Sequence, residues 1–408
     1  MHWLSGRTTL VLLAAAGLLT CSAGSAVAGQ AAAPASVAKW TKISTGTGLG
    51  LASAGLYRTA DGRLHVAWAR KDGTTYSMHY STIGSGAKLL NTGTIVSKWA
   101  GVSFYPRLIA AAKGGMRLVF SGGNGKNGSP YDLGAMYSAT SGSAGMTWTL
   151  APGALSHSGL VSLTDDAAVA EPDGTPVASW AAGDLLDYHI GISPTVPDPN
   201  PDHSVSVGAG SVVIGPTLAR AKDGSIAVAW FTSSGQANQG YWVDQILPTS
   251  KGKVKAPGSG GKNLGNNQPL EAVAFTARVG GGEYLAYCVP TKILLCGHIA
   301  LWRVGAAKAV TVPGSATGQA SHVAIAASPG GYLWIGWFDS GMGKIRLVRT
   351  SAAATKFGAV RTIAAPPKLG ILSDVQIEAS KGAADVIALM QQNVPSASPL
   401  YWDTQVKP

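Results

Sequence analysis

The chain has 408 residues and a formal net charge of +11, with 46% hydrophobic and only 12% charged residues, where about 25% charged is usual. This content of Val, Ile, Leu and Trp excludes a disordered chain, because disordered chains carry too little apolar surface to bury. The 54 Gly and 22 Pro residues indicate a globular chain that is dense in turns.

The first residues have the pattern of a secretory signal. Arg7 precedes an apolar run over residues 10–19, and Ala-Val-Ala at 26–28 matches a small-residue cleavage site. The apolar run is shorter than the roughly 20 residues that cross a bilayer. We therefore predict a signal peptide over residues 1–28 and a secreted, extracellular protein with no membrane span. A lipid anchor at Cys21 remains the alternative.

One short phrase, a tight turn followed by a strand that ends on a large apolar residue, recurs along the chain. Its clearest copy is DGSIAVAW at residues 223–230. Successive copies lie roughly 50 to 60 residues apart, which is typical of repeat arrays and propellers. The seven copies end at Trp68, Phe120, Trp180, Trp230, Tyr287, Trp337 and Leu389.

Each repeat contains more than this central strand. An alternating strand precedes the turn, a third strand follows, and a looser fourth strand leads to the next repeat. The residue before the final aromatic is small in most copies, as at Ala229, so the central strand has one large and one small apolar face. We predict a single all-β domain over residues 29–408, a seven-bladed β-propeller of four-stranded antiparallel blades.

The two ends of the chain fit ring closure. The last repeat ends with LYWDTQV, a third strand, and lacks its fourth strand, whereas VAKWTKIS at residues 37–44 forms a strand before the first repeat. Pairing these two strands would remove two exposed edges. We predict that the N-terminal strand completes the last blade, and that the protein is a monomer.

Residues 141–148, SGSAGMTW, resemble the Asp-box of the BNR-repeat, sialidase-like propellers, with Ser143 standing where that family has Asp. The resemblance implies a secreted bacterial propeller in which this segment is a structural turn between the third and fourth strands of a blade. It does not imply sialidase activity. The place of the family's Arg-Ile-Pro motif, counted back from Gly62, holds Ala52, and no catalytic residue of the family can be carried over.

The innermost strand of a blade begins near the mouth of the central channel, and its first residues are the candidate site. Carboxylates and an imidazole gathered there could position a cation, a sugar, or two carboxylates for acid/base chemistry on a glycoside. The alternative is that they cap strand ends and bind channel water. These channel-mouth candidates are Tyr105, Asp165, Asp166, Glu271, His322 and Asp374.

Two cysteines remain after the predicted leader. Cys288 directly follows the strand that ends at Tyr287, and the segment VPTKILL returns the chain to Cys296. In an oxidising compartment such a pair would join the two strands of a hairpin. We predict a Cys288–Cys296 disulfide, and we predict neither a metal site nor a cofactor.

These features favour a secreted binding module for glycans or cell-envelope polymers over an enzyme. If the protein is an enzyme, a glycoside hydrolase or lyase that uses the channel-mouth carboxylates is the alternative, and a protein-protein interaction scaffold is a second. The basic residues are scattered apart from Lys251, Lys253 and Lys255 in a Gly-rich loop. No nucleic-acid-reading motif accompanies them, so we predict no nucleic-acid partner.

Overall fold

The protein is described from a computed structural model, in which Ala33–Pro408 form one compact unit. The predicted signal peptide lies outside the described residues. Within the described residues, no helix has the length and apolar character needed to cross a membrane. The described residues are 39–44, 53–102, 105–123, 135–142, 144–152, 156–157, 166–183, 188–193, 203–206, 212–233, 239–260, 272–292, 295–366, 371–391 and 400–408.

The described strands form seven antiparallel sheets, numbered here in chain order. Sheet 1 contains β2 (Gly55–Arg58), β3 (Leu64–Asp72), β4 (Thr75–Gly84) and β5 (Lys88–Trp99). Sheet 2 contains β6 (Gly101–Val102), β7 (Arg107–Ala110), β8 (Met116–Gly123), β9 (Ala135–Ser141), β10 (Trp148–Leu150) and β11 (Ser156–His157). Sheet 3 contains β12 (Asp166–Ala170), β13 (Pro176–Gly183), β14 (Tyr188–Ser193) and β15 (His203–Ser206). Sheet 4 contains β16 (Val212–Arg220), β17 (Ile226–Ser233), β18 (Gly240–Leu247) and β19 (Val254–Lys255).

The remaining sheets follow the same plan. Sheet 5 contains β20 (Ala274–Ala277), β21 (Glu283–Lys292), β22 (Leu295–Arg303) and β23 (Val310–Thr311). Sheet 6 contains β24 (Ala320–Ala327), β25 (Leu333–Asp339), β26 (Lys344–Arg349) and β27 (Arg361–Ala364). Sheet 7 contains β28 (Ile371–Ala379), β29 (Ala384–Gln391), β30 (Leu400–Val406) and, from the other end of the chain, β1 (Thr41–Lys42). In the described part of the chain, two short 3₁₀ turns, η1 (Ser85–Ala87) and η2 (Ala112–Gly114), lie between strands.

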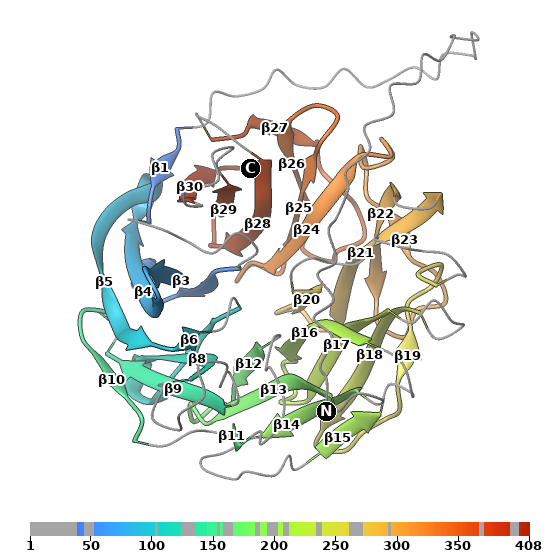
Figure 1. Cartoon of the computed structure of the whole chain (residues 1–408). Helices are drawn as coiled ribbons and strands as arrows, with labels where there is room; N and C mark the ends of the chain where they lie inside the picture. Colours follow the sequence, from blue (N-terminus) through green and yellow to red (C-terminus); the bar gives the residue numbers. More distant parts are fainter. Residues whose placement is uncertain are drawn as a thin grey trace, which may run out of the picture. The chain divides into compact units, whose positions relative to one another are not determined.

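The sheets follow one another in sequence order around a central axis (Figure 1). The innermost strands β2, β7, β12, β16, β20, β24 and β28 each contact the next one, and β28 contacts β2. The hydrophobic core is divided accordingly, because each buried cluster joins two neighbouring sheets. The fold is therefore an all-β propeller built of four-stranded antiparallel blades, as the repeats predicted.

The recurring Asp-Gly forms the turn between the first and second strands of a sheet. The Asp223 carboxylate accepts hydrogen bonds from the backbone N–H of Ser225 (3.0 Å) and from its hydroxyl (2.7 Å). The next residue, Gly224, has φ +87°, a conformation that L side chains rarely adopt. After the turn, every residue from 226 to 232 is buried, so the central strand is enclosed by neighbouring sheets on both faces.

The predicted N-terminal closure is confirmed. β1 pairs with β30, with Thr41 opposite Asp403 and Lys42 opposite Trp402. The contact continues beyond the ladder, because the Ile43 N–H donates to the Tyr401 carbonyl (3.0 Å) and the Tyr401 N–H donates to the Ser44 hydroxyl (2.9 Å). Sheet 7 thus takes its outer strand from the start of the described chain.

The Asp-box-like segment and the cysteines lie where the sequence placed them. Residues 141–148 connect β9 to β10, the third and fourth strands of sheet 2, with Gly145 at φ +64°; Ser143 lies outside the described residues. Cys288 and Cys296 form a disulfide between β21 and β22, with their Cα atoms 5.3 Å apart. The predicted disulfide is confirmed.

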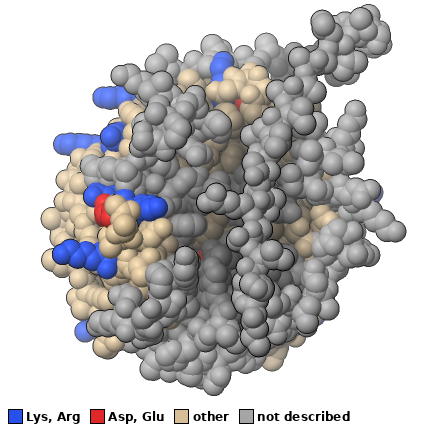
Figure 2. All heavy atoms as spheres, in the orientation of Figure 1, with Lys and Arg blue, Asp and Glu red and all other residues tan. Residues whose placement is uncertain are grey.

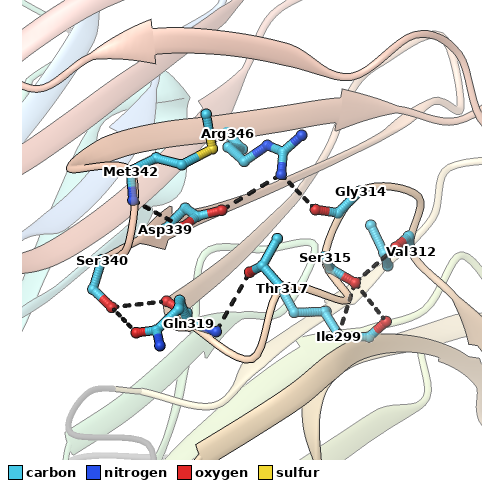
Figure 3. Close-up of polar contacts among 10 residues, drawn as sticks. All are labelled: Ile299, Val312, Gly314, Ser315, Thr317, Gln319, Asp339, Ser340, Met342 and Arg346. Atoms are coloured by element: carbon cyan, nitrogen blue, oxygen red, sulfur yellow. Dashed lines mark hydrogen bonds and ion pairs between the residues drawn. The ribbon is translucent and has the colours of Figure 1, made fainter. Parts of the chain in front are cut away.

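Polar contacts also tie neighbouring sheets together, as Figure 3 shows for sheets 5 and 6. Arg346 in β26 donates to the Gly314 carbonyl (2.7 Å) from the segment that follows β23, and its guanidinium lies 3.4 Å from the Asp339 carboxylate. The buried Ser315 hydroxyl donates to the Val312 carbonyl (2.7 Å) and accepts from the Ile299 N–H (2.9 Å). These polar groups meet one another's hydrogen-bonding needs within the fold, so we assign them a structural role.

Candidate functional site

A cavity of about 300 Å³ lies on the axis of the ring and is lined by residues of all seven innermost strands or the residues next to them. Most of its lining residues are apolar and range in size from Ala to Phe. Its polar side chains belong to Ser53, Arg107, Thr217, Asp374, Gln376 and Glu378. A concave site with a few convergent polar groups is the usual form of a small-ligand site.

Asp374 is the channel-mouth candidate that lines this cavity. It lies at the start of β28, is 3% exposed, and is close enough to Tyr401 to act on it electrostatically, as is Tyr105. Burial, followed by the negative charge of Asp374 and the neighbouring Tyr105, raises the pKa of the Tyr401 hydroxyl well above its usual value. The structure therefore brings two predicted residues, Tyr105 and Asp374, around one buried phenol.

Gln376 follows Asp374 on the same face of β28. Its side-chain oxygen accepts a hydrogen bond from the Ala54 N–H (3.0 Å), which joins β28 of sheet 7 to the start of sheet 1. Ser53, the residue before Ala54, is fully buried and lines the cavity. The contact between sheets 7 and 1 that closes the ring therefore also positions this part of the cavity wall.

Asp166 lies at the start of β12, but its side chain is engaged away from the cavity lining. Its carboxylate accepts hydrogen bonds from the Ser121 N–H (2.7 Å) and hydroxyl (3.0 Å) of β8. Its carbonyl accepts from the side chain of Arg107 (2.8 Å), a residue that lines the cavity. Asp166 thus joins sheets 2 and 3 and helps to position Arg107.

His322 occupies an irregular point of β24, where the register with β25 shifts between Ser321 and Ala324. Its φ is +49°, and its ring centroid lies 6.4 Å from that of Phe338 in β25. The neighbouring Val323, Ala324 and Ile325 line the cavity, but His322 is not part of the lining. Asp165 and Glu271 lie outside the described residues, so their places at the mouth stay predictions.

A second group of ionisable residues, which the repeats did not predict, lies where sheets 1 and 7 meet. Arg58 of β2 forms an ion pair with Asp385 of β29 (2.5 Å). Glu378 faces the same guanidinium and the cavity, and burial raises its pKa to about 7. Asp403 of β30 is fully buried, and burial followed by the charge of Asp385 raises its pKa well above the usual value. We call Arg58, Glu378, Asp385 and Asp403 the junction cluster.

One sequence signal could have revealed the junction cluster. Counting back from the large residue that ends each central strand, Asp385 stands where other copies have Leu64, Ile226 and Leu333. All three of these apolar residues are fully buried. A carboxyl at such a position predicts either a partner cation or a bound proton, because an isolated buried charge is too costly.

The cavity residues can donate and accept hydrogen bonds in several directions at once. Asp374 supplies acceptors, Arg107 supplies donors, and Thr217 can do both. Asp374 and Glu378 are four residues apart on one strand, which corresponds to about 13 Å along β28. This exceeds the carboxyl separations of roughly 5 to 9.5 Å that glycoside hydrolysis uses. Among the described residues, no group of three or more His, Cys, Asp or Glu could hold a metal ion.

The visible face of the ring also carries net positive charge among its described residues. Lys and Arg side chains gather near the edge formed by β3–β5, with an acidic group between them (Figure 2). Arg70 and Asp72 in this region are an ion pair (2.5 Å). The excess of basic side chains agrees with the formal charge of +11 and would attract anionic polymers.

Comparisons with known proteins identify the fold and no sequence family. No protein-family model matches the chain, and no curated protein sequence matches it. The crystal structure of the polysaccharide lyase Uly1 is similar over 90% of this chain and 92% of that chain, with a TM-score of 0.57 and 12% identity.

Two further solved structures resemble the chain more weakly. The Hadza microbial sialidase Hz136 covers 87% of this chain and 65% of its own length, with a TM-score of 0.49 and 13% identity. The α-L-arabinanase of Penicillium chrysogenum complexed with arabinobiose covers 79% and 98%, with a TM-score of 0.47 and 10% identity. The chain is thus a β-propeller, and at 12% identity its similarity to the polysaccharide lyase Uly1 is a similarity of fold.

Proposed function

We propose that the protein is a secreted, glycan-binding β-propeller whose seven sheets are the seven blades of one ring. The blade number is supported by the contacts of the innermost strands, which run in order from β2 to β28 and return from β28 to β2. Secretion is supported by the signal-like residues 1–28 and is compatible with the Cys288–Cys296 disulfide.

The observation that carries the proposal is the axial cavity of about 300 Å³ with Asp374, Arg107 and Thr217 in its wall. A sugar presents several hydroxyl groups, each of which donates and accepts hydrogen bonds. Carboxylate, guanidinium and hydroxyl groups around one hollow match that pattern. We propose that one sugar unit of an extracellular polysaccharide enters this cavity.

The positions of the two carboxyl groups in the described cavity lining, and of Tyr401 beside them, favour binding over catalysis. Asp374 and Glu378 are about 13 Å apart along their strand, too far to act together on one glycosidic bond. Tyr401, the phenol beside Asp374, is fully buried, and its raised pKa keeps it protonated at neutral pH. A general base of a lyase has to reach the substrate and accept a proton, and Tyr401 suits neither task.

The test is binding of the purified protein to a panel of neutral and acidic polysaccharides, measured by isothermal titration calorimetry. Asp374→Asn should weaken binding by about tenfold, because a charge-assisted hydrogen bond contributes about 1.5 kcal/mol or more. Glu171→Gln, which changes a carboxyl outside the cavity lining, is the matched control and should bind normally.

The alternative functions predict different results in the same panel. Release of reducing ends, or of unsaturated ends detected by ultraviolet absorbance, would make the protein a hydrolase or lyase. Failure of every polysaccharide to bind would overturn the glycan proposal and favour a scaffold for a protein partner.

A further inference from the structure

A second pocket, of about 310 Å³, lies on sheet 6 away from the axis. Its floor is formed at the end of β26 and the start of β25, where Arg349 lies opposite Trp334 in the antiparallel ladder. Tyr332 lies in the turn between the end of β24 and the start of β25. The pocket is therefore at the end of the sheet opposite to Ala320, the residue at which β24 begins. We call it the basic-aromatic pocket, defined by Tyr332, Trp334, Arg349, Lys356, Phe357 and Arg361.

Arg349 is fixed in the pocket by two aromatic rings. Its guanidinium carbon lies 4.5 Å from the ring centroid of Tyr332 and 5.7 Å from that of Trp334. Trp334 is 2% exposed and therefore rigid, whereas Tyr332 and Arg349 are half-buried. Stacking on aromatic faces leaves the edge of the guanidinium, with its N–H groups, free to point toward a ligand.

The wall of the pocket is built by a short loop after β26. The Ser351 hydroxyl accepts hydrogen bonds from the Thr355 and Lys356 N–H groups (both 3.2 Å), and the Gly358 N–H donates to the Arg349 carbonyl (2.8 Å). Arg278, from the turn of sheet 5, donates to the Ala352 carbonyl. These contacts hold the loop in place before any ligand binds, which lowers the entropic cost of binding.

The charges in the pocket are unbalanced. Arg349, Lys356 and Arg361 line it, as does Pro408, the last residue of the given sequence, with its terminal carboxylate, and none of the described lining residues has an acidic side chain. Within the described residues, no ion pair involves these three side chains, and no residue accepts a hydrogen bond from the Arg349 guanidinium. An arginine that is positioned by packing and left without an acceptor is suited to bind an anion.

We propose that the basic-aromatic pocket binds the anionic group of an acidic sugar, a carboxylate or a sulfate, within a polysaccharide. Arg349 would donate two parallel hydrogen bonds to the anion, and Lys356 and Arg361 at the exposed rim would add long-range attraction. The half-buried ring of Phe357 offers an apolar surface on which a sugar ring can stack. This site is separate from the axial cavity and does not depend on it.

The experiment compares Arg349→Gln with the wild-type chain by titration calorimetry. The probes are an oligogalacturonate, a sulfated oligosaccharide, a neutral oligosaccharide of equal length and single-stranded DNA. We expect an acidic oligosaccharide to bind with an affinity that falls at least tenfold in Arg349→Gln and that weakens at high salt. The uronate and sulfate arms distinguish the two anions.

Two further variants keep the result interpretable. Arg303→Gln removes an equally charged, exposed arginine from neighbouring β22 and should leave binding unchanged. Lys356→Gln, at an exposed position, should weaken binding severalfold even if Arg349→Gln proves unstable.

The proposal is overturned if neither acidic oligosaccharide binds, or if binding is the same in Arg349→Gln and Lys356→Gln as in the wild type. It is also overturned if DNA binds as tightly as the acidic sugars with the same dependence on Arg349. That outcome would make the pocket a general phosphate site.

Discussion

The Arg58 guanidinium in β2 lies 2.5 Å from the Asp385 carboxylate in β29, so a buried ion pair joins the first sheet to the last. Their side chains are 13% and 1% exposed. Glu378 and Asp403 act electrostatically on the same pair, which gives three carboxyls and one cation at the junction. Neither oxygen of Asp403 has a hydrogen-bond partner among the described residues. Because one cation cannot balance three buried carboxylates, the raised pKa values of Glu378 and Asp403 favour their protonated, uncharged forms.

Removing the cation should destabilise the junction strongly. Arg58→Met leaves Asp385 buried without its partner, which typically costs about 3 to 5 kcal/mol. We expect this loss in the free energy of unfolding at about pH 8 and a smaller loss at about pH 5, because protonated carboxyls need no counter-charge. Denaturant unfolding at both pH values measures the difference.

The matched control for Arg58→Met is Arg63→Met. Arg63 pairs with Asp61 at 3.4 Å, but its side chain is 45% exposed, so its removal should cost less than about 1 kcal/mol. Equal losses for the two variants, or a loss at Arg58 that does not depend on pH, would contradict the burial argument.

Glu378 should make the fold less stable as the pH rises. Its pKa is about 7 in the folded chain and near 4.5 when unfolded, so the folded state holds the proton over a wider range. The stabilising effect of that proton is fully present below about pH 4.5 and is lost as the pH rises through 7. The total is up to about 3 kcal/mol, since one pKa unit corresponds to about 1.4 kcal/mol.

Glu378→Gln should therefore gain stability relative to the wild type between about pH 5 and pH 8. Comparing the two chains at each pH also removes the opposite contribution of His65, whose pKa is lowered by burial to about 4. A difference in the free energy of unfolding that stays constant across this range would show that Glu378 is charged throughout.

The elements that repeat were predictable, and the residues that depart from the repeat were not. Asp223 and Gly224 mark a turn whose geometry is local, so the sequence alone identifies it. Asp166 is different. Neighbouring residues of a strand face opposite sides, and one position of register decides whether the carboxylate faces the channel or, as observed, Ser121 of the preceding sheet. Register between sheets cannot be derived from a local pattern.

Gly145 should tolerate alanine less well than another glycine with positive φ. At Gly62, with φ +85°, an added Cβ meets nothing within 4 Å, so Gly62→Ala should cost only the about 1 to 2 kcal/mol of the left-handed conformation. At Gly145 the Cβ would lie 2.7 Å from the His65 ring of sheet 1. Overpacking should add about 1 to 3 kcal/mol there.

The comparison is made by thermal and denaturant unfolding of both alanine variants. A loss at Gly145 no greater than the loss at Gly62 would indicate that the Asp-box-like turn moves away from His65 at little cost. The expected larger loss would show that this turn helps to fasten sheet 2 to sheet 1.

The disulfide should stabilise the chain through the small loop that it closes. The sequence separation of Cys288 and Cys296 is 8, and a loop of this size corresponds to about 2 to 3 kcal/mol. The double variant Cys288→Ser, Cys296→Ser should lose this amount. The wild type should lose a similar amount in a reducing buffer, to which the variant should be insensitive. A variant as stable as the oxidised wild type would argue against the pairing.

Closure of the ring should depend on Ile43, which is 1% exposed and packs in the cluster shared by sheets 1 and 7. Ile43→Ala leaves β1 paired with β30 but creates a cavity, at a cost of about 2 to 5 kcal/mol. Val310→Ala, at a residue that is 58% exposed in β23, should change stability by less than about 0.5 kcal/mol. Hydrogen exchange provides the sharper measurement. The Tyr401 N–H donates to the Ser44 hydroxyl, so loosening of β1 should speed its exchange. Exchange of the amides in sheet 4 should change less. Uniform acceleration across all sheets would instead mean that the ring opens only by global unfolding.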